Sequence, residues 1–149
     1  MSAHVLIVED EEPLRISMAI ALKRGGYDVA EAGTVRAAVA LLEQEAFDLV
    51  LSDLRLPDGD GLEVLRRAAE LVPDARVLIM TAYGTVNTAV EAMQGGAFDF
   101  VQKPFAPEQL MHRVERALEH GRMSSELRRL SRATDPTVDI VGRSAPMQL

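Results

Sequence analysis

The chain has 149 residues, no cysteine and a formal net charge of −7, and these values exclude several classes of function before any motif is considered. The length suits one domain with a short extension, and the lack of cysteine rules out a disulfide framework, a thiolate metal site and a cysteine nucleophile. The excess of acidic groups argues against a nucleic-acid surface on this chain, because phosphate backbones are bound by clustered Lys and Arg side chains.

The first apolar run follows the N-terminus closely and covers residues 5–8. It is too short for a signal sequence or a membrane span, so we expect a soluble cytoplasmic protein without membrane contact. Four further apolar runs follow at intervals of roughly 21 to 28 residues, at 27–30, 49–52, 77–80 and 98–101. The first, third and fourth runs are nearly continuous Val, Leu and Ile, which is typical of parallel strands that helices cover on both faces.

Between these runs, the apolar residues change to a helical spacing. Two segments show it most clearly, with apolar residues at i, i+3, i+4 and i+7: Val35, Ala38, Val39 and Leu42 in one, and Val86, Ala89, Val90 and Met93 in the other. Each segment predicts a helix with one apolar face. Pro13, the pair Asp60 and Glu63, and Pro107 mark the expected starts of three helices.

Five strand–helix units with short loops favour an α/β fold. Right-handed crossovers place helices on both faces of a sheet, and five strands are too few for an eight-stranded barrel, so we expect a doubly wound, five-stranded parallel sheet with five flanking helices. The expected strand order is the flavodoxin-like 2-1-3-4-5, within one domain over residues 1–120. Such sheets bind ligands beyond the carboxyl ends of their strands, where the strand order reverses.

After about residue 120 the sequence becomes rich in Arg, Ser and Glu, and we interpret residues 121–137 as a helical linker. The spacing of Met123, Leu127 and Leu130 also suits a short coiled-coil seam, although Gly121 interrupts the register of the preceding helix. A solvated linker and a dimerising coiled coil both remain open. Residues 138–149 look like the start of a further unit.

Polar residues follow the predicted strands at the edge where such sheets bind ligands. Glu9 and Asp10 follow the first strand, Asp53 the third, Thr81 the fourth and Lys103 the fifth. Strands one and three are neighbours in the predicted order, so their carboxylates would repel each other unless a cation lies between them. Ligands that are all oxygen favour Mg²⁺, which keeps several waters and binds through one or two carboxylates. Each residue alone could be a turn, cap or surface residue, and only their joint occurrence at the strand ends predicts a site.

Four motifs around these residues resemble those of the receiver domains of bacterial response regulators, and the resemblance covers about residues 4–120. In chain order the motifs are Ile7-Val8-Glu9-Asp10-Glu11, Leu51-Ser52-Asp53-Leu54-Arg55-Leu56-Pro57 with Asp60-Gly61, Met80-Thr81-Ala82, and Lys103-Pro104-Phe105.

The resemblance implies that Asp53 is the phosphoacceptor and that Mg²⁺ is the cofactor. Asp10, Asp53 and the backbone carbonyl of Arg55 would hold the ion, while Glu9 would assist through a water molecule. Asp53 would take the phosphoryl group from a phosphohistidine of a cognate sensor histidine kinase by in-line attack. The chain would then be a phosphoacceptor signalling domain that catalyses its own phosphorylation and slow dephosphorylation, and not an enzyme in the ordinary sense.

The same resemblance assigns the phosphate site. Thr81, Ala82, Lys103 and Leu54 would bind the phosphoryl oxygens, and Thr81 and Lys103 would also take part in catalysis. The peptide bond between Lys103 and Pro104 would be cis, as it is in this family.

Phosphorylation is expected to switch the conformation of such a domain. Thr81 would move toward the phosphoryl oxygens, and Phe100, at the family's switch position, would rotate inward. These movements would shift a two-state equilibrium on the face formed by the fourth helix, the fifth strand and the fifth helix. We expect a homodimer through this face, through the linker, or through both.

The end of the chain carries a second resemblance. Residues 140–148 resemble the opening of the AAA+ ATPase module of sigma-54-dependent transcriptional activators, so residues 138–149 would be the start of a truncated module. Together with the receiver motifs, this implies an activator of the nitrogen-regulatory, NtrC type. Its receiver would control a C-terminal ATPase and a DNA-binding output that lie outside this chain.

The sequence fits three other functions less well. A dinucleotide-binding domain is disfavoured because no G-x-G-x-x-G motif follows the first strand. A phosphatase of the haloacid-dehalogenase type would also form an aspartyl phosphate, but Arg55 stands where that family needs a second Asp. A phosphorylation-independent receiver-like module for interaction or dimerisation remains the alternative, although the acceptor and the Lys whose loss usually marks such modules are both present.

Overall fold

The computed structural model describes residues 3–82 and 86–119, apart from the side chains of residues 86, 88 and 89. The predicted linker at 121–137 and the predicted ATPase segment at 138–149 lie outside these residues. Within the described part of the chain, no helix combines the length and the apolar character that crossing a membrane requires.

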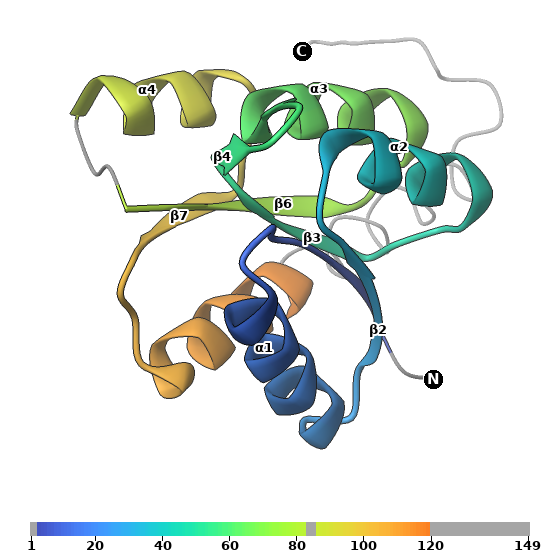
Figure 1. Ribbon diagram of the computed structural model, residues 1–149, viewed down its shortest axis with the longest axis vertical. Helices are drawn as coiled ribbons and strands as arrows, with labels where there is room; N and C mark the ends of the chain where they lie inside the picture. The colour runs from blue at the N-terminus through green and yellow to red at the C-terminus, as the bar shows by residue number, and fades with distance from the viewer. Residues whose placement is uncertain (1–2, 83–85, 120–149) are drawn as a thin grey trace, which may run out of the picture.

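A five-stranded parallel sheet forms the centre of the fold (Figure 1). Its strands are β1 (His4–Val8), β2 (Asp28–Ala32), β3 (Leu49–Asp53), β6 (Arg76–Thr81) and β7 (Asp99–Gln102). They lie in the order β2-β1-β3-β6-β7, and every neighbouring pair is parallel. Counted over the strands of this sheet, the order is the predicted 2-1-3-4-5, so the doubly wound sheet is confirmed.

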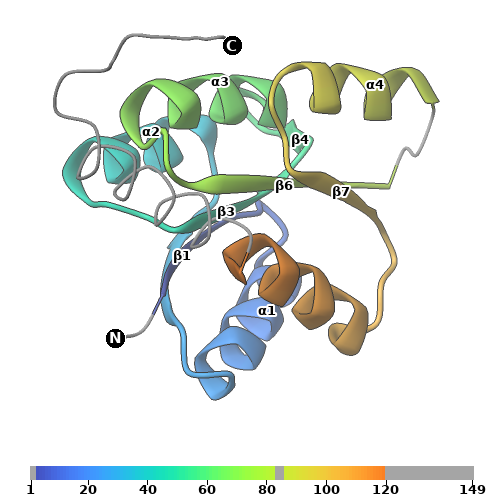
Figure 2. The same cartoon turned by 180° about the vertical axis from the view of Figure 1, so that it is seen from behind.

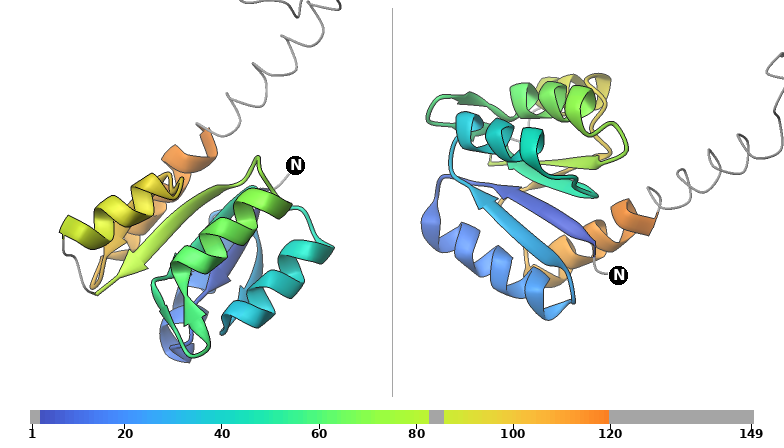
Figure 3. Two further views of the ribbon diagram at one scale, coloured as in Figure 1. Left: turned by 90° about the horizontal axis from the view of Figure 1, so that it is seen from above. Right: turned by 90° about the vertical axis from the view of Figure 1, so that its right-hand side faces the viewer.

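Within residues 3–82 and 86–119, five helices flank the sheet. They are α1 (Glu12–Arg24), α2 (Val35–Gln44), α3 (Gly61–Leu71), α4 (Val86–Gln94) and a fifth helix that begins at residue 107 and is described up to residue 119. Helices α2, α3 and α4 cover one face of the sheet, whereas α1 and the helix at 107–119 cover the other (Figures 1 and 2). Seen from above, α4, α3 and α2 lie side by side across the sheet (Figure 3). The predicted fold class is therefore confirmed in its layers as well as in its sheet.

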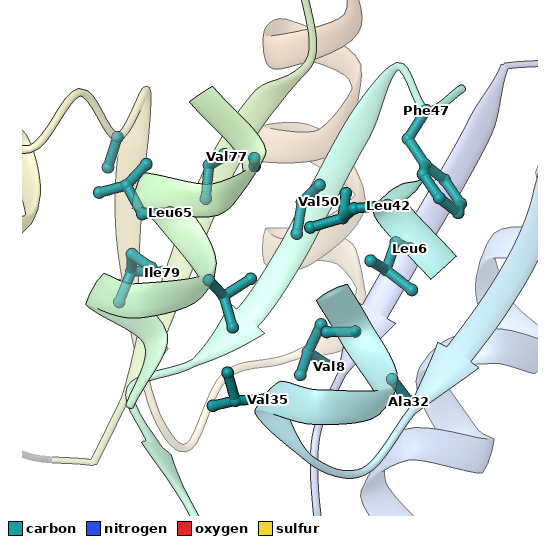
Figure 4. Close-up of a cluster of buried hydrophobic side chains, with 14 of the residues drawn as sticks. Leu6, Val8, Ala32, Val35, Leu42, Phe47, Val50, Leu65, Val77 and Ile79 are labelled. Atoms are coloured by element: carbon teal, nitrogen blue, oxygen red, sulfur yellow. The ribbon is translucent and has the colours of Figure 1, made fainter. Parts of the chain in front are cut away.

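Two hydrophobic cores hold these layers together, one on each face of the sheet. The core beneath α2 and α3 includes Leu6, Val8, Val50, Val77 and Ile79 from the strands and Val35, Leu42 and Leu65 from the helices (Figure 4). The core on the other face includes Val5, Ile7, Leu49, Leu51 and Leu78 from the strands and Leu22, Leu110 and Val114 from the helices. Neighbouring residues of β1 thus point into different cores, which explains why that run is apolar at every position.

The helices start where the sequence predicts. Asp60 is the N-cap of α3, and its carboxylate accepts a hydrogen bond from the amide of Glu63 at 3.0 Å. Pro13 lies in the first turn of α1, and the fifth helix begins at Pro107. These residues either satisfy or remove the amide donors that the start of a helix leaves without partners.

A small antiparallel hairpin follows β3 and was not predicted. It pairs β4 (Arg55–Leu56) with β5 (Gly59–Asp60). Strands of two residues are too short to show a hydrophobic period, so no sequence pattern could have indicated them. The hairpin matters for function because it begins two residues after Asp53 and contains Arg55.

The predicted helix is confirmed as α4, but part of its apolar face is exposed. Val90 and Met93 are 44% and 47% exposed, whereas Ala92 is buried in the core. The end of α4 lies close to α3, since a Cβ on Gly95 would be 2.9 Å from Cδ2 of Leu65. Only small residues fit where α4 lies this close to α3. The larger apolar side chains Val90 and Met93 therefore face outward.

Candidate functional site

The carboxyl ends of β1, β3, β6 and β7 meet at one edge of the sheet and bring the predicted polar residues together. Glu9 and Asp10 follow β1, Asp53 and Thr81 are the last residues of β3 and β6, and Lys103 follows β7. Oxygen atoms from the carboxylates of Glu9, Asp10 and Asp53 all lie within 4.8 Å of one another. The predicted meeting of carboxylates from two adjacent strands is therefore confirmed.

Lys103 connects two of these carboxylates through its ammonium group. Its Nζ donates hydrogen bonds to Oε1 of Glu9 at 2.7 Å and to Oδ2 of Asp53 at 3.0 Å. The backbone helps to hold Lys103 here, because its amide donates to the carbonyl of Thr81 at 2.8 Å. The peptide bond between Lys103 and Pro104 is cis, as the family resemblance implies.

Burial determines the electrostatics of the Glu9 and Lys103 pair. Glu9 is fully buried, and this burial raises its pKa, although the hydrogen bond from Lys103 offsets part of the effect. For Lys103, burial favours the neutral amine, but the hydrogen bonds to Glu9 and Asp53 outweigh it and raise the pKa of Lys103. The raised pKa of Glu9 disfavours its carboxylate anion, whereas the raised pKa of Lys103 favours its ammonium cation. The two shifts therefore disagree about the ion pair. At a contact of 2.7 Å the charged pair prevails, because hydrogen bonds between ionised groups are the strong ones.

The site suits a hard divalent cation. Three carboxylates face one ammonium group, which leaves a formal charge of minus two. The donor atoms are carboxylate oxygens, and oxygen ligands are those that Mg²⁺ prefers. Both oxygens of Glu9 already accept hydrogen bonds, one from Lys103 and one from the amide of Glu11 at 3.0 Å. Asp53 also accepts two hydrogen bonds, from Lys103 and from the amide of Arg55. The division of Glu9, Asp10 and Asp53 into direct and indirect ligands therefore stays a prediction.

The backbone amides after Asp53 have different partners at Leu54 and at Arg55. The amide of Leu54 donates to the carbonyl of Met80 at 2.8 Å, and its carbonyl accepts from the amide of Gly61 at 2.8 Å. The amide of Arg55 instead faces the carboxylate, with its nitrogen 3.4 Å from Oδ1 of Asp53. The amide of Leu54 is therefore engaged by Met80 in this structure, whereas the amide of Arg55 lies beside the carboxylate of Asp53. The role of Leu54 in phosphate binding stays a prediction.

The predicted switch residues lie on neighbouring strands. Thr81 is buried at the end of β6, and Ala82, which follows it, is exposed. Phe100 pairs in register with Ile79, and its half-buried ring packs against the core beneath α2 and α3. The movement of Thr81 and Phe100 on phosphorylation stays a prediction.

Two residues that the sequence analysis missed support the site from outside. Arg15 of α1 donates to the backbone carbonyl of Glu9 at 3.0 Å. Asp58, in the turn of the hairpin, accepts hydrogen bonds from the amides of Val35 and Arg36 at 2.7 and 3.0 Å and so ties the hairpin to the start of α2. No hydrophobic period or motif marks either residue, because each contact depends on how a loop folds back.

Comparison with known proteins places this geometry in a family. Residues 5–115 match the family described as response regulator receiver domain. The C4-dicarboxylate transport transcriptional regulatory protein DctD of Rhizobium meliloti is 33% identical over 147 residues, which are 97% of this chain and 32% of DctD. The chain spans about a third of the length of the curated relatives that it matches.

Two solved structures extend the comparison. NtrX from Brucella abortus, solved in complex with ADP, has a TM-score of 0.84 and 33% identity, covering 99% of this chain and 33% of that one. The beryllofluoride-activated receiver domain dimer of NtrC4 has a TM-score of 0.75 and 35% identity, covering 79% of this chain and 98% of that one. These relatives agree with the predicted NtrC-type class. Since the family match extends over most of the described residues, including the acidic edge and Lys103, the chain belongs to the response regulator receiver domain family.

Proposed function

We propose that this chain accepts a phosphoryl group on Asp53 from a phosphohistidine of a sensor histidine kinase, in a Mg²⁺-dependent reaction. The observation that carries the proposal is the contact of Lys103 Nζ with Oδ2 of Asp53 at 3.0 Å, beside carboxylate oxygens of Glu9 and Asp10 within 4.8 Å. Phosphoryl transfer depends mainly on positioning and on neutralising charge. A carboxylate nucleophile flanked by an ammonium group and by further oxygen ligands meets both needs.

In the proposed step, an oxygen of Asp53 forms a bond to phosphorus while the bond from phosphorus to the donor's imidazole nitrogen breaks. The electron pair of that bond stays on the nitrogen. Lys103 remains protonated and places its charge beside the transferring oxygens, and the amide of Arg55 faces the same carboxylate. A Mg²⁺ ion held by Asp10, Asp53 and the backbone carbonyl of Arg55, with Glu9 acting through water, would supply further charge neutralisation.

The product is an aspartyl phosphate that we expect to persist long enough to signal. Phosphatases that form the same intermediate need an acid–base carboxylate two residues after the nucleophile, and Arg55 stands there instead. The chain would therefore catalyse its own phosphorylation and only a slow dephosphorylation, and it would not turn over external phosphate esters.

The phosphoryl group is proposed to act on the rest of the domain through Thr81 and Phe100. Thr81, Ala82 and Lys103 would bind the new oxygens, and Phe100 would turn inward from β7. Both movements would alter the face formed by α4, β7 and the helix at 107–119, through which we expect a homodimer. The exposure of Val90 and Met93 on α4 supports this expectation, as does the NtrC4 receiver domain, whose beryllofluoride-activated structure is a dimer.

In the longer protein, the receiver would control a C-terminal AAA+ ATPase of the sigma-54 activator class, and DNA binding would lie in that output part. The short length of this chain relative to DctD and the sequence after residue 138 support this arrangement. The cytoplasm is the compartment in which a histidine kinase and such an activator would meet.

The experiment that tests the acceptor is incubation with acetyl phosphate and Mg²⁺ followed by intact-mass spectrometry. Wild type should gain one phosphoryl group, Asp53→Asn should gain none, and EDTA should prevent the gain. Asp28→Asn is the matched control, because it removes an exposed carboxylate from the start of β2, and it should be phosphorylated like wild type.

Two results would contradict the proposal. Phosphorylation of Asp53→Asn would place the acceptor elsewhere, and a wild type that stays unmodified would favour a phosphorylation-independent module. Rapid hydrolysis of p-nitrophenyl phosphate would instead favour a phosphatase.

A further inference from the structure

The guanidinium group of Arg15 joins three parts of the chain next to the acidic cluster. Its Nη1 donates to the backbone carbonyl of Glu9 at 3.0 Å, and its Nε forms an ion pair with Oε1 of Glu31 at 3.1 Å. Its Nη2 lies 3.6 Å from Oε2 of Glu12 in the first turn of α1. The side chain of Arg15 is 18% exposed, so these contacts are largely shielded from water.

The carbonyl that Arg15 holds belongs to the peptide between Glu9 and Asp10. The amide on the other side of Glu9 is also fixed, because it donates to the carbonyl of Ala32 at 2.9 Å. The backbone of Glu9 is thus anchored twice, once by β2 and once by α1. Because the backbone sets the direction of the side chains that it carries, Arg15 helps to aim Glu9 and Asp10 at Asp53.

Asp10 depends on this anchor more than Glu9 does. The carboxylate of Glu9 is buried and bonded to Lys103, whereas Asp10 is exposed. An exposed side chain has rotamer freedom, and repulsion from neighbouring carboxylates favours rotamers that point away from them. The charge of Arg15 does little to reduce that repulsion, since its own ion-pair partners are other acidic residues.

We propose that Arg15 is a positioning residue for divalent-cation binding, which holds the peptide between Glu9 and Asp10 so that both carboxylates face Asp53. This inference rests on the proposed function and adds a residue to it. The planar guanidinium bonds a carbonyl and a carboxylate in fixed directions at the same time, which a single ammonium group cannot reproduce.

Isothermal titration calorimetry of Mg²⁺ into the full chain tests the proposal. We expect Arg15→Ala to weaken Mg²⁺ binding by about tenfold, the usual effect of removing a residue that orients metal ligands. Arg24→Ala removes a positive charge from the exposed end of the same helix and should bind Mg²⁺ like wild type. Arg15→Lys should lie between the two, because the ammonium group retains the charge but only part of the hydrogen bonding.

Two further readouts separate positioning from a purely structural role. In ¹H–¹⁵N spectra without metal, Arg15→Ala should shift the amide signal of Asp10, whose nitrogen belongs to the peptide that Arg15 holds. Glu31→Gln weakens the ion pair that orients Arg15, so it should reduce the Mg²⁺ affinity in the same direction and by a smaller factor.

A variant Arg15→Ala that unfolds more readily but binds Mg²⁺ with wild-type affinity would overturn the proposal, since Arg15 would then only brace the fold. Should Arg15→Ala fail to fold, wild-type affinity in both Arg15→Lys and Glu31→Gln would overturn it equally. A wild type that does not bind Mg²⁺ would instead defeat the proposed function, so the two failures are distinguishable.

Discussion

Lys103 balances a site that contains more negative than positive charge. One more methylene than Asp lets the carboxylate of Glu9 reach Nζ of Lys103 at 2.7 Å, while its other oxygen accepts from the amide of Glu11. Because Glu9 is fully buried, loss of the ammonium group would leave a carboxylate without its partner, which usually costs about 3–5 kcal/mol. The same ammonium group also contacts Asp53, so stability and the proposed acceptor depend on one side chain.

Substitution of Gly61 should disturb the proposed acceptor Asp53 through the backbone alone. A Cβ at this position would lie 2.5 Å from the carbonyl oxygen of Asp53 and 3.1 Å from the Cα of Leu54. Both are backbone atoms, so neither can move aside without shifting the end of β3. We predict that Gly61→Ala lowers the free energy of unfolding by about 1–3 kcal/mol, the usual cost of overpacking, as measured by urea denaturation.

Gly33→Ala is the matched control for this prediction. Its Cβ would lie 3.4 Å from Nη1 of Arg15, which is an ordinary van der Waals contact that nothing needs to yield. Its free energy of unfolding should stay within about 0.5 kcal/mol of wild type. Equal stability of Gly61→Ala and wild type would show that the turn after β3 yields easily and would contradict the argument.

At the scale of elements, Asp58 joins the hairpin to α2 and makes this contact dependent on pH. Hydrogen bonds from the amides of Arg36 and Val35 lower the pKa of Asp58 below its ordinary value of 3.8. Because the pKa of Asp58 is lower in the folded state than in the unfolded state, its carboxylate stabilises the fold at any pH above the unfolded-state pKa. This stabilisation is lost as the pH falls through the folded-state pKa. We predict that Asp58→Asn is less stable than wild type at neutral pH and that the difference shrinks below about pH 4.

Urea unfolding at a series of pH values measures this difference. Asp28→Asn, which removes an exposed carboxylate from the start of β2, is the matched control for the change in charge. A stability difference for Asp58→Asn that stays constant from neutral to acidic pH would mean that the carboxylate charge has no role at the start of α2.

The elements that could be predicted are those whose burial leaves a continuous or periodic pattern. Residues 5–8 alternate between two cores, so every position is apolar and β1 is visible in the sequence. The hairpin has no such pattern, and the exposed side of α4 has a misleading one, because Ala92 packs inward while Val90 and Met93 face solvent. In α4, tertiary packing against α3 decides the buried face, and the helical period alone does not report it.

The candidate site could be predicted because parallel strands bring their carboxyl ends to one edge. Glu9, Asp53 and Lys103 need only the strand order to be placed together, and the structure brings them within hydrogen-bonding distance. Which backbone amide faces Asp53 could not be predicted. The amides of Leu54 and Arg55 are neighbours in the chain, and only the direction of each peptide decides which one points at the carboxylate. The contact of Arg15 with the carbonyl of Glu9 could not be predicted either, because it depends on how the loop between β1 and α1 folds.

At the scale of the whole molecule, two pairs of large apolar side chains are exposed on opposite faces of the sheet within the part of the chain that the structure describes. Ile16 and Ile20 of α1 are 45% and 47% exposed, and Val90 and Met93 of α4 are exposed to a similar degree. Helix α4 lies beside β7, the edge strand of the sheet, whereas α1 lies on the other side (Figure 1). Because the proposed switch residue Phe100 belongs to β7, the pair on α4 is the one that phosphorylation should affect.

We therefore predict that beryllofluoride and Mg²⁺ convert the chain to a dimer. The double variant Val90→Gln with Met93→Gln should weaken this dimer roughly tenfold or more, because it removes two apolar side chains that the interface would bury. Sedimentation velocity measures the effect. Ile16→Gln with Ile20→Gln is the matched control on α1 and should dimerise like wild type.

A second comparison uses a chain without residues 122–149. Dimerisation that survives this deletion but not the α4 substitutions assigns the interface to the face of α4, β7 and the helix at 107–119. If the α4 variant dimerises normally and the deletion abolishes the dimer, the linker carries the interface and the prediction for α4 is wrong.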